Sequence, residues 1–357
     1  INNLPLFNDP KGPNPRNFDA QINYKAKSNW FNYRPSDVTV KEIYGERKNT
    51  TPEDNFITVL DYKFFPNERG PYNWFPNLSD RTKNWGGIMK YLSSTANNLI
   101  EENVEFIEFW IKIVKAPPNL KLKIDLGQIS EDVIPNGKLD TEDKNLNDLV
   151  DDGEDTGIDG LFDKDEPGYN PTINPDPSND NYFFQMSNNP DFSRFNGTEG
   201  NIKSIEQSRL PDSEDLNRNF TLDLVNSYFR YEIPLDTNRT TNPFIQGSGN
   251  NGWYLFKIPL KDFVMKEGNP SFSVVEFIRF WISGATQDVH IRFAEMNLVG
   301  NQWQKVLDQR VTIDDEVLTV STISVEENPE YVSPPGVQRE RDRSKPDYEI
   351  FKNEQAL

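Results

Sequence analysis

The chain has 357 residues, of which 57 are acidic and 38 basic, and its formal net charge is −19. Because nucleic-acid and anionic-membrane surfaces need clustered Lys and Arg, this balance argues against nucleic-acid binding and against a basic membrane-binding patch. Cysteine is absent, so disulfides, thiolate metal sites and a cysteine nucleophile are excluded, while the length allows two domains with cores of their own.

Residues 1–45 form an irregular lead segment with short strands. The first 28 residues are rich in Asn and Pro and show no periodicity, whereas the pattern from Trp30 to Tyr44 favours a short pair of strands. The opening residues INNLPLFNDP do not resemble a signal peptide, and the chain starts at Ile1 without Met. We therefore expect a portion of a longer protein, and no apolar run approaches the length of a spanning helix.

Residues 46–130 are predicted to form the first β-sandwich. The segment DNFITVLDYKFF from Asp54 alternates apolar and polar residues, and VEFIEFWI from Val104 is followed by a polar break and by LKLKIDLG. Alternation at period two is typical of a strand with one buried face, and strand, turn and strand predict a hairpin. Seven letters of VEFIEFWI recur from Val275 in VEFIRFWI. This repeat predicts a mainly β chain with two related antiparallel jelly-roll-like β-sandwich domains.

The repeated strands have one uniform face and one mixed face. Ile107, Phe109 and Ile111 share the face that we expect in the core. The mixed face carries two aromatic residues around one charge, namely Phe106, Glu108 and Trp110 in the first copy and Phe277, Arg279 and Trp281 in the second. A covering loop or domain would bury this face, and a platform for sugar rings or peptides would leave it open. Because the one mismatch reverses charge, we also hypothesise that the two domains pack through these faces, with Glu108 near Arg279.

Residues 131–215 form a long acidic region that we expect to link the two domains. Its composition is typical of disorder, but three stretches in it and just beyond it partly fit the twelve-residue calcium loop, in which oxygen ligands alternate around a glycine. The candidate ligands are Asp132, Asn136, Asp140 and Asp143 in the first stretch, Asp155, Asp159, Asp163 and Glu166 in the second, and Asp215, Asn217, Asn219 and Asp223 in the third.

Each of these three stretches departs from the calcium-loop pattern at one position. Ile134 and Gly157 stand at position three, and Phe220 stands at position six, where the glycine is expected. Two interpretations stay open. The region is either a connector stiffened by bound calcium, which would order a self-repelling segment, or a solvated acidic linker.

The C-terminal part continues the β pattern and then loses it. Residues 216–307 are predicted to form the second β-sandwich, with the second copy of the repeat inside it. Residues 308–357 contain one strand, from Val317, followed by a charged, Pro-rich linker.

Candidate catalytic groups are scarce. The single histidine, His290, falls on the polar side of its strand and is expected to be solvated, and no nucleophile-elbow sequence accompanies it. Zinc sites built from Cys and His are excluded, and no glycine-rich loop fits a phosphate-binding pattern. A glycosidase would need two carboxylates facing one cleft, and acidic candidates are Glu105, Glu276, Glu295 and Asp125. We expect a protein that is not an enzyme.

Long segments of the chain strongly resemble the SprA family, also called Sov, of outer-membrane proteins. The similar motifs are NWGGIMKYLSSTANNLIEENVEFIEFWI from Asn84, LGQISEDVIPNGKLD from Leu126, EDTGIDGLFDKDE from Glu154, PDSEDLNRN from Pro211 and SVEENPEYVSPPGV from Ser324. In that family the protein is the translocon of the type IX secretion system, required for secretion to the cell surface and for gliding motility. The resemblance covers nearly the whole chain but not the giant transmembrane β-barrel of the family.

The resemblance implies a soluble portion of an outer-membrane translocon at the cell surface. Its expected partners are other secretion-system subunits and exported cargo proteins, and it would meet the membrane only through the missing barrel. The aromatic faces at Trp110 and Trp281 would be natural contact points. The main alternative is a secreted carbohydrate-binding protein with calcium-stiffened sandwich modules. Exposed Trp110 or Trp281 in a groove would favour sugar binding, whereas covered aromatic residues would favour the translocon.

Overall fold

A computed structural model gives the fold of most of the chain. The described residues are 24–32, 38–48, 50–51, 55–73, 78, 80, 82–92, 97–134, 137–154, 156–166, 168–178, 180, 211–300, 323–326, 328, 330–334 and 355–356. Among them no helix is long or apolar enough to cross a membrane.

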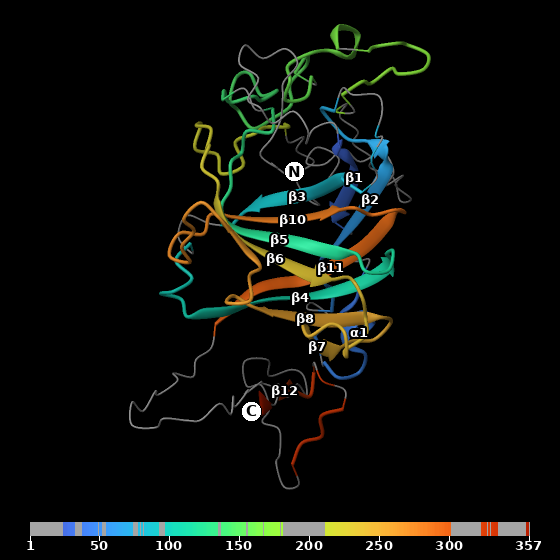
Figure 1. Cartoon of the computed structure of the whole chain (residues 1–357), viewed down its shortest axis with the longest axis vertical. Helices are drawn as coiled ribbons and strands as arrows, with labels where there is room; N and C mark the ends of the chain where they lie inside the picture. The colour runs from blue at the N-terminus through green and yellow to red at the C-terminus, as the bar shows by residue number, and fades with distance from the viewer. Residues whose placement is uncertain are drawn as a thin grey trace.

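Two antiparallel sheets stack face to face in the middle of the molecule (Figure 1). The six-stranded sheet has the order β1 (Ala26–Asn32), β2 (Val59–Arg69), β11 (Val289–Gly300), β4 (Val104–Lys115), β8 (Trp253–Pro259) and β7 (Ile245–Ser248). The five-stranded sheet has the order β3 (Trp85–Tyr91), β10 (Phe277–Ser283), β5 (Lys121–Gln128), β6 (Ser227–Pro234) and β9 (Met265–Glu267). The remaining elements are helix α1 (Val40–Tyr44), the 3-10 turn η2 (Asp163–Asp165), and a pair formed by β12 (Ile323–Ser324) and β13 (Gln355–Ala356).

The main core lies between the two sheets. Phe109 of β4 is fully buried, and its ring centroid lies 5.9 Å from that of Phe256, 6.0 Å from that of Phe280 and 5.6 Å from that of Phe293. These rings come from both sheets, so the face that period-two alternation assigned to the core is indeed the one that joins the layers. The mainly β, antiparallel sandwich class is confirmed.

The two copies of the repeat do not form a sandwich each, because their strands alternate within both sheets. In the five-stranded sheet β10, from the second copy, lies between β3 and β5 of the first copy. In the six-stranded sheet β4, from the first copy, lies between β11 and β8 of the second copy. Each repeated strand therefore pairs along both edges with strands of the other copy, and the two copies make one sandwich.

The two predicted hairpins are not formed, since β4 and β5 lie in different sheets, and so do β10 and β11. Strand β4 pairs with β11 and β8, whereas β5 pairs with β10 and β6. Each short break, which contains Pro117 and Pro118 in the first copy, thus carries the chain from one layer to the other. Period-two alternation shows which face of a strand is buried but not which strand is its neighbour, so the sequence pattern could not distinguish a hairpin from this crossing.

The acidic region is an insertion between two neighbouring strands, not a connector between two domains. It leaves the five-stranded sheet at Gln128, the end of β5, and re-enters it at Ser227, the start of β6. These two residues are antiparallel partners, so the insertion begins and ends at one point of the sheet (Figure 1). We call residues 129–226 the acidic insertion.

Glycine makes room for the close approach of β3 and β10. Gly87 lies opposite Trp281, and a Cβ atom at residue 87 would lie 2.3 Å from the carbonyl oxygen of Phe280. A side chain at this position would force the two strands apart, which explains the glycine at residue 87.

Replacing Phe109 with alanine tests the shared core. Phe109→Ala removes a ring that contacts both sheets, and we expect the free energy of unfolding to fall by about 3–5 kcal/mol in chemical denaturation. Val114→Ala is the matched control, because Val114 lies on the same strand and is 47% exposed. This control is expected to change the free energy by less than about 0.5 kcal/mol. Equal effects of the two variants would contradict a core centred on Phe109.

Candidate metal centre

Buried glutamates organise the acidic insertion, which does not behave as a merely solvated linker in its described parts. Glu142 is fully buried, and its two carboxylate oxygens accept hydrogen bonds from the backbone N–H groups of Asp212 at 2.6 Å and Gly157 at 3.0 Å. Glu214 accepts in the same way from Ile134 at 2.7 Å and Asp140 at 3.0 Å. Each carboxylate therefore ties together segments that are far apart in the sequence. Buried Glu131 has the same role, since it accepts from the N–H of Leu216 at 2.9 Å. Buried Glu154 and Glu166 accept backbone N–H groups over shorter distances in the sequence.

The three predicted loops share a backbone turn at position six. This position has a positive φ in each loop, 71° at Gly137, 69° at Gly160 and 61° at Phe220. A phenylalanine in the left-handed region is uncommon, because its Cβ atom crowds the backbone there. Phe220 therefore differs from the calcium-loop pattern in residue type, but it has the backbone conformation that the glycine would have. The turn that brings the loop oxygens together is formed.

In the third loop the predicted ligands are close together. Asp215 accepts hydrogen bonds from the N–H groups of Asn219 at 3.0 Å and Phe220 at 2.7 Å. The side-chain amide of Asn217 donates to Asp223 at 2.6 Å. Loops that fold on a leading aspartate in this way are pre-shaped for a cation, but these hydrogen bonds also satisfy the Asp215 and Asp223 carboxylates without one.

In the first predicted loop the candidate ligands have partners in different segments. Asp132 accepts from the N–H of Gly137 at 3.4 Å, whereas Asp140 donates its own N–H to Glu214. Asp143 instead accepts from the N–H groups of two residues that follow it in the chain, Asn147 at 3.1 Å and Asp148 at 2.8 Å. Asn136 of this loop and Asp155 of the second lie outside the described residues.

Asp143 thus opens a fourth loop that sequence reasoning missed. Position six of this loop is Asp148, and its φ is 62°. The signal was present in the sequence, because oxygen-bearing residues occupy positions one, three, five, nine and twelve, namely Asp143, Asn145, Asn147, Asp151 and Glu154. The absence of a glycine at position six concealed the pattern.

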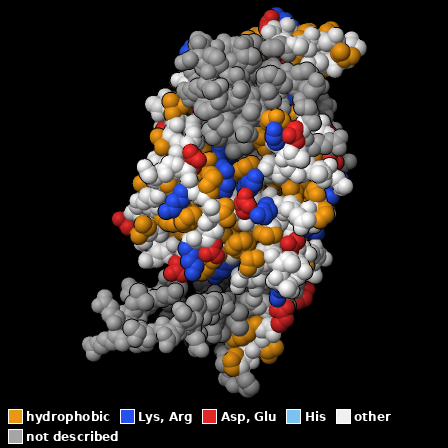
Figure 2. Space-filling model, in the orientation of Figure 1, with side chains coloured by type: hydrophobic (Ala, Val, Ile, Leu, Met, Phe, Trp, Pro, Cys, Tyr) orange, Lys and Arg blue, Asp and Glu red, His pale blue; other side chains and the backbone are white. Residues whose placement is uncertain are grey.

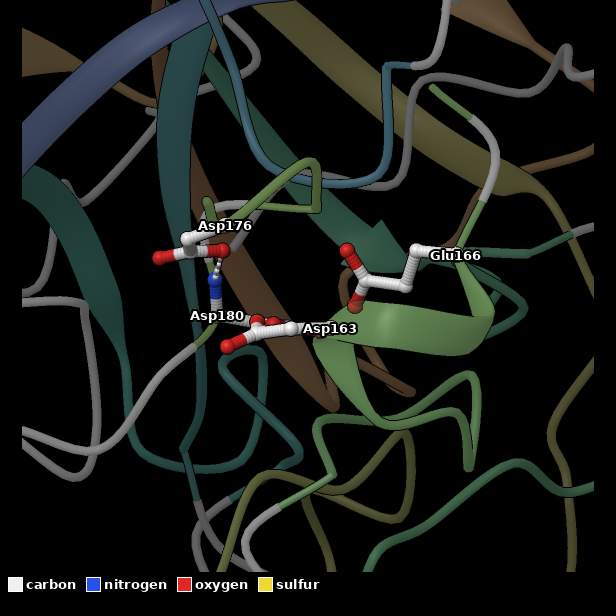
Figure 3. Close-up of side chains that lie close together, drawn as sticks. All are labelled: Asp163, Glu166, Asp176 and Asp180. Carbon is white, nitrogen blue, oxygen red and sulfur yellow. Dashed lines mark hydrogen bonds between the residues drawn. The ribbon is translucent and has the colours of Figure 1, made fainter. Parts of the chain in front are cut away.

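Four carboxylates converge around the 3-10 turn η2, at Asp163, Glu166, Asp176 and Asp180 (Figure 3). One oxygen from each of the four lies within 4.8 Å of the others. Asp163 is the first residue of the turn and Glu166 follows its last, and both were predicted. Asp176 and Asp180 come from the next segment and were missed, since none of the three predicted loops contains them. Asp159, predicted with this group, instead accepts from the N–H of Leu161 at 2.9 Å and the hydroxyl of Ser178 at 3.3 Å.

Two members of this four-carboxylate cluster are deeply buried. Glu166 is 5% exposed and Asp180 is 4% exposed. Burial raises the pKa of Glu166 to about 7, although hydrogen bonds from Ser178 oppose the shift. Burial, together with the neighbouring negative charges of Glu166 and Asp159, raises the pKa of Asp180 to about 10. The cause is the same in both cases, because a carboxylate in a low-dielectric site beside other carboxylates holds a proton more tightly.

The cluster is attached to the end of β2. Tyr72 donates its backbone N–H to the carbonyl of Ser178 at 3.1 Å, and its hydroxyl accepts the N–H of Ile158 at 3.2 Å. Tyr72 and Ile158 also form a small apolar cluster with Ile134. Gly157 packs so closely on Asp180 that a Cβ atom would lie 2.0 Å from its Oδ2 atom, which explains the glycine at position three.

The mixed face of β4 is covered by the lead segment. Trp110 is 2% exposed, its ring centroid lies 5.1 Å from that of Tyr44 in an edge-on contact, and its indole N–H donates to the Tyr44 hydroxyl at 2.9 Å. Helix α1 thus closes over this side of the six-stranded sheet. Phe106 and Glu108 are half-buried, and Lys257 contacts both, with its Nζ atom 4.5 Å from the Phe106 ring centroid and 3.8 Å from the Glu108 carboxylate.

The mixed face of β10 contains a buried ion network. Asp125 of β5 lies in register between Arg279 of β10 and Arg230 of β6. It accepts a hydrogen bond from Arg279 at 2.6 Å, one from Arg230 at 2.6 Å and one from the indole N–H of Trp281 at 3.0 Å. Arg279 and Asp125 are fully buried, so one carboxylate compensates two guanidinium groups across three strands.

The remaining predicted contact residues on this face are equally covered. Phe277 is fully buried with Met89 and Tyr228, and Trp281 is 7% exposed. Figure 2 shows Lys and Arg side chains gathered at the middle of the visible face, where β10, β5 and β6 lie in Figure 1, with Asp and Glu beside them. The positively charged groups therefore form a local cluster in a strongly acidic chain.

The hypothesis that Glu108 and Arg279 meet is wrong. Glu108 lies on the outer side of the six-stranded sheet and pairs with Lys257, whereas Arg279 lies on the outer side of the five-stranded sheet and pairs with Asp125. The reason is that the apolar faces of β4 and β10 pack against each other between the two sheets. Their mixed faces therefore point outward in opposite directions.

The groups that were considered for catalysis have structural partners. His290 is half-buried, and its Nε2 atom lies 2.8 Å from Asp61, which also accepts from Arg292 at 3.0 Å. Of the carboxylate candidates, Asp125 belongs to the ion network in the five-stranded sheet, and Glu295 of the six-stranded sheet accepts the Tyr44 hydroxyl. These two carboxylates are held in different layers, away from a shared cleft.

A family model, SprA_N, described as a motility related/secretion protein, matches residues 176–357, just over half of the chain. No curated protein matches the chain significantly.

Removing the shared carboxylate tests the ion network. Asp125→Ala leaves Arg279 buried without its counter-charge, and we expect the free energy of unfolding to fall by about 3–5 kcal/mol in urea titration. Glu232→Ala, on the neighbouring strand, breaks an exposed pair with Lys121 and is expected to cost less than about 1 kcal/mol. A loss below 1 kcal/mol for Asp125→Ala would show that the network contributes little.

Removing a capping glutamate tests the organisation of the acidic insertion. In Glu142→Ala the buried N–H groups of Gly157 and Asp212 lose their acceptor, at a cost of about 1–3 kcal/mol for each group. We expect faster amide hydrogen exchange at these two residues and unchanged exchange in the β-strands. Asp152→Ala, at an exposed residue of the same insertion, is the control. Unchanged exchange in Glu142→Ala would contradict the role of this carboxylate.

Proposed function

Because the chain belongs to the SprA_N family of motility related/secretion proteins, we propose that it is a non-enzymatic, soluble portion of an outer-membrane translocon. The translocon is that of the type IX secretion system, and the chain serves protein export to the cell surface and gliding motility. The family match over residues 176–357 is the observation that carries this proposal. Long motifs outside the matched residues, such as VEFIEFWI from Val104, support it.

The burial of the aromatic faces favours this function over carbohydrate binding. A sugar platform needs a tryptophan ring that is open on one face, because the ring stacks on the apolar side of the sugar. Trp110 is 2% exposed under α1, and Trp281 is 7% exposed with its N–H committed to Asp125. Neither ring is available to a saccharide without moving the residues that cover it.

Contacts with secretion-system subunits and cargo proteins would then use other parts of the surface than the two tryptophans. Exposed apolar side chains lie at the end of the sandwich where β4 begins, including Ile100 at 61% and Val274 at 39%. The segments that carry them are joined, since the N–H of Leu99 donates to Phe272 and the N–H of Val275 donates to Asn97. Apolar groups on a shared, hydrogen-bonded rim are typical of protein contact surfaces.

Replacing the acidic insertion tests the proposal in cells that carry the full-length protein. Gln128 and Ser227 are antiparallel partners, so a short Gly-Ser linker can join β5 to β6 without disturbing the sheets. We expect the variant to reach the outer membrane in normal amounts but to lose export of cargo to the cell surface and gliding, because residues 176–226 of the insertion lie within the region matched to the family. Immunoblotting of membrane fractions and of the culture medium gives both quantities.

Two outcomes would contradict the proposal. The first is normal export and gliding in cells whose only copy lacks the insertion. The second is binding of the 357-residue chain to a polysaccharide in affinity electrophoresis, with binding lost in Trp281→Ala, which would favour the carbohydrate-binding alternative.

A further inference from the structure

The four-carboxylate cluster gathers more negative charge than its surroundings compensate. Arg69, at the end of β2, is close enough to attract Asp176 and Glu166. Its guanidinium, however, donates to the carbonyl of Asn73 at 2.9 Å and to the side chain of Asn174 at 3.4 Å. One partly engaged arginine cannot offset four carboxylates whose oxygens lie within 4.8 Å of one another.

Two buried carboxylate oxygens in the cluster accept no hydrogen bond from the described residues. They are the Oε1 atom of Glu166 and the Oδ2 atom of Asp180, which belong to side chains that are 95% and 96% buried. The second oxygen of Glu166 does accept a bond, from the N–H of Ser178 at 2.8 Å, so the side chain is held in place. Buried acceptors without a donor are costly, and both residues also place a carboxylate oxygen within 4.8 Å of the other ligand oxygens of the cluster.

The donor set and its spacing select a hard cation. Oxygens on opposite sides of a calcium ion, each at about 2.4 Å from it, are about 4.8 Å apart, and around magnesium they are about 4.2 Å apart, so the spacing fits either ion. Calcium is favoured because it accepts a cage of protein carboxylates, whereas magnesium loses its water reluctantly and usually keeps several water ligands. The four oxygens of the cluster lie within 4.8 Å of one another. Zinc would prefer nitrogen or sulfur, but the chain has no cysteine and its one histidine, His290, bonds Asp61 on β2.

We propose that Asp163, Glu166, Asp176 and Asp180 bind one calcium ion, which fastens the acidic insertion to the β-sandwich. The ion joins the turn η2 to the segment that holds Asp176 and Asp180. Ser178, within that segment, accepts the backbone N–H of Tyr72 just after β2. Calcium therefore holds the two sides of the attachment together, and its removal loosens the insertion while the sheets stay folded.

Calcium titration of the 357-residue chain, after removal of metals with EDTA, tests this site. In Glu166→Gln with Asp180→Asn the size of both side chains is kept but two charges are lost, and we expect one calcium equivalent fewer than in the wild type, or binding at that site weakened at least 100-fold. Asp165→Asn, at an exposed residue of the same turn, is the matched control and keeps the wild-type number of equivalents.

Amide hydrogen exchange across residues 158–180 gives a second, independent measurement. Calcium should slow exchange in the wild type and in Asp165→Asn but not in the double variant. In EDTA the double variant should exchange no faster than the wild type, because its amide side chains fill the same space and bury no charge.

Three results would overturn the proposal. One is a wild-type chain that takes up no calcium, and another is a double variant that keeps the same number of equivalents. The third is magnesium slowing exchange across residues 158–180 as strongly as calcium does.

Discussion

Strand pairing between the two copies of the repeat is the constraint on which the rest of the structure depends. Each repeated strand has both edges hydrogen-bonded to strands of the other copy, so neither copy has a sheet of its own. The core follows from this arrangement, because Phe109 and Phe280 occupy equivalent positions in the repeat and meet between the layers. The mixed faces then point outward on opposite sides, one under α1 and the other around Asp125. Sequence repetition here encodes an approximate symmetry within one domain.

A second constraint governs the acidic insertion, where hydrophobic burial is slight. Its segments are held by buried glutamates that accept backbone N–H groups from distant residues, as Glu142 and Glu214 do. A carboxylate accepts several such bonds and replaces the backbone ladder that a sheet would supply. At Glu166 and Asp180 there are fewer hydrogen-bond donors than carboxylate oxygens, and a bound cation would stabilise the oxygens that have no donor. Composition alone suggested disorder, but the arrangement of these acids favours an ordered structure.

The sequence predicted the buried face of each repeated strand and placed Asp163 and Glu166 in one loop, because periodicity and loop spacing are local properties. It left open whether the face with Trp110 is covered. It could not predict that β4 and β5 lie in different sheets, since alternation carries no information on partners. Asp176 and Asp180 were missed because they join the cluster through tertiary structure and not through loop spacing. The charge reversal between Glu108 and Arg279 suggested contact, but each has a cross-strand partner that only the topology reveals.

The interleaving of the two copies also determines when the domain can fold. Strand β4 lacks both neighbours until β8 and β11 have been synthesised, well over a hundred residues later. Such distant pairings make folding slow, because the entropy of closing long loops is lost before the stabilising contacts between strands can form. Until then β4 presents two open strand edges, which are templates for aggregation. A chain of this topology therefore depends on being kept apart from other chains, by a chaperone or by its surroundings, until its last strands arrive.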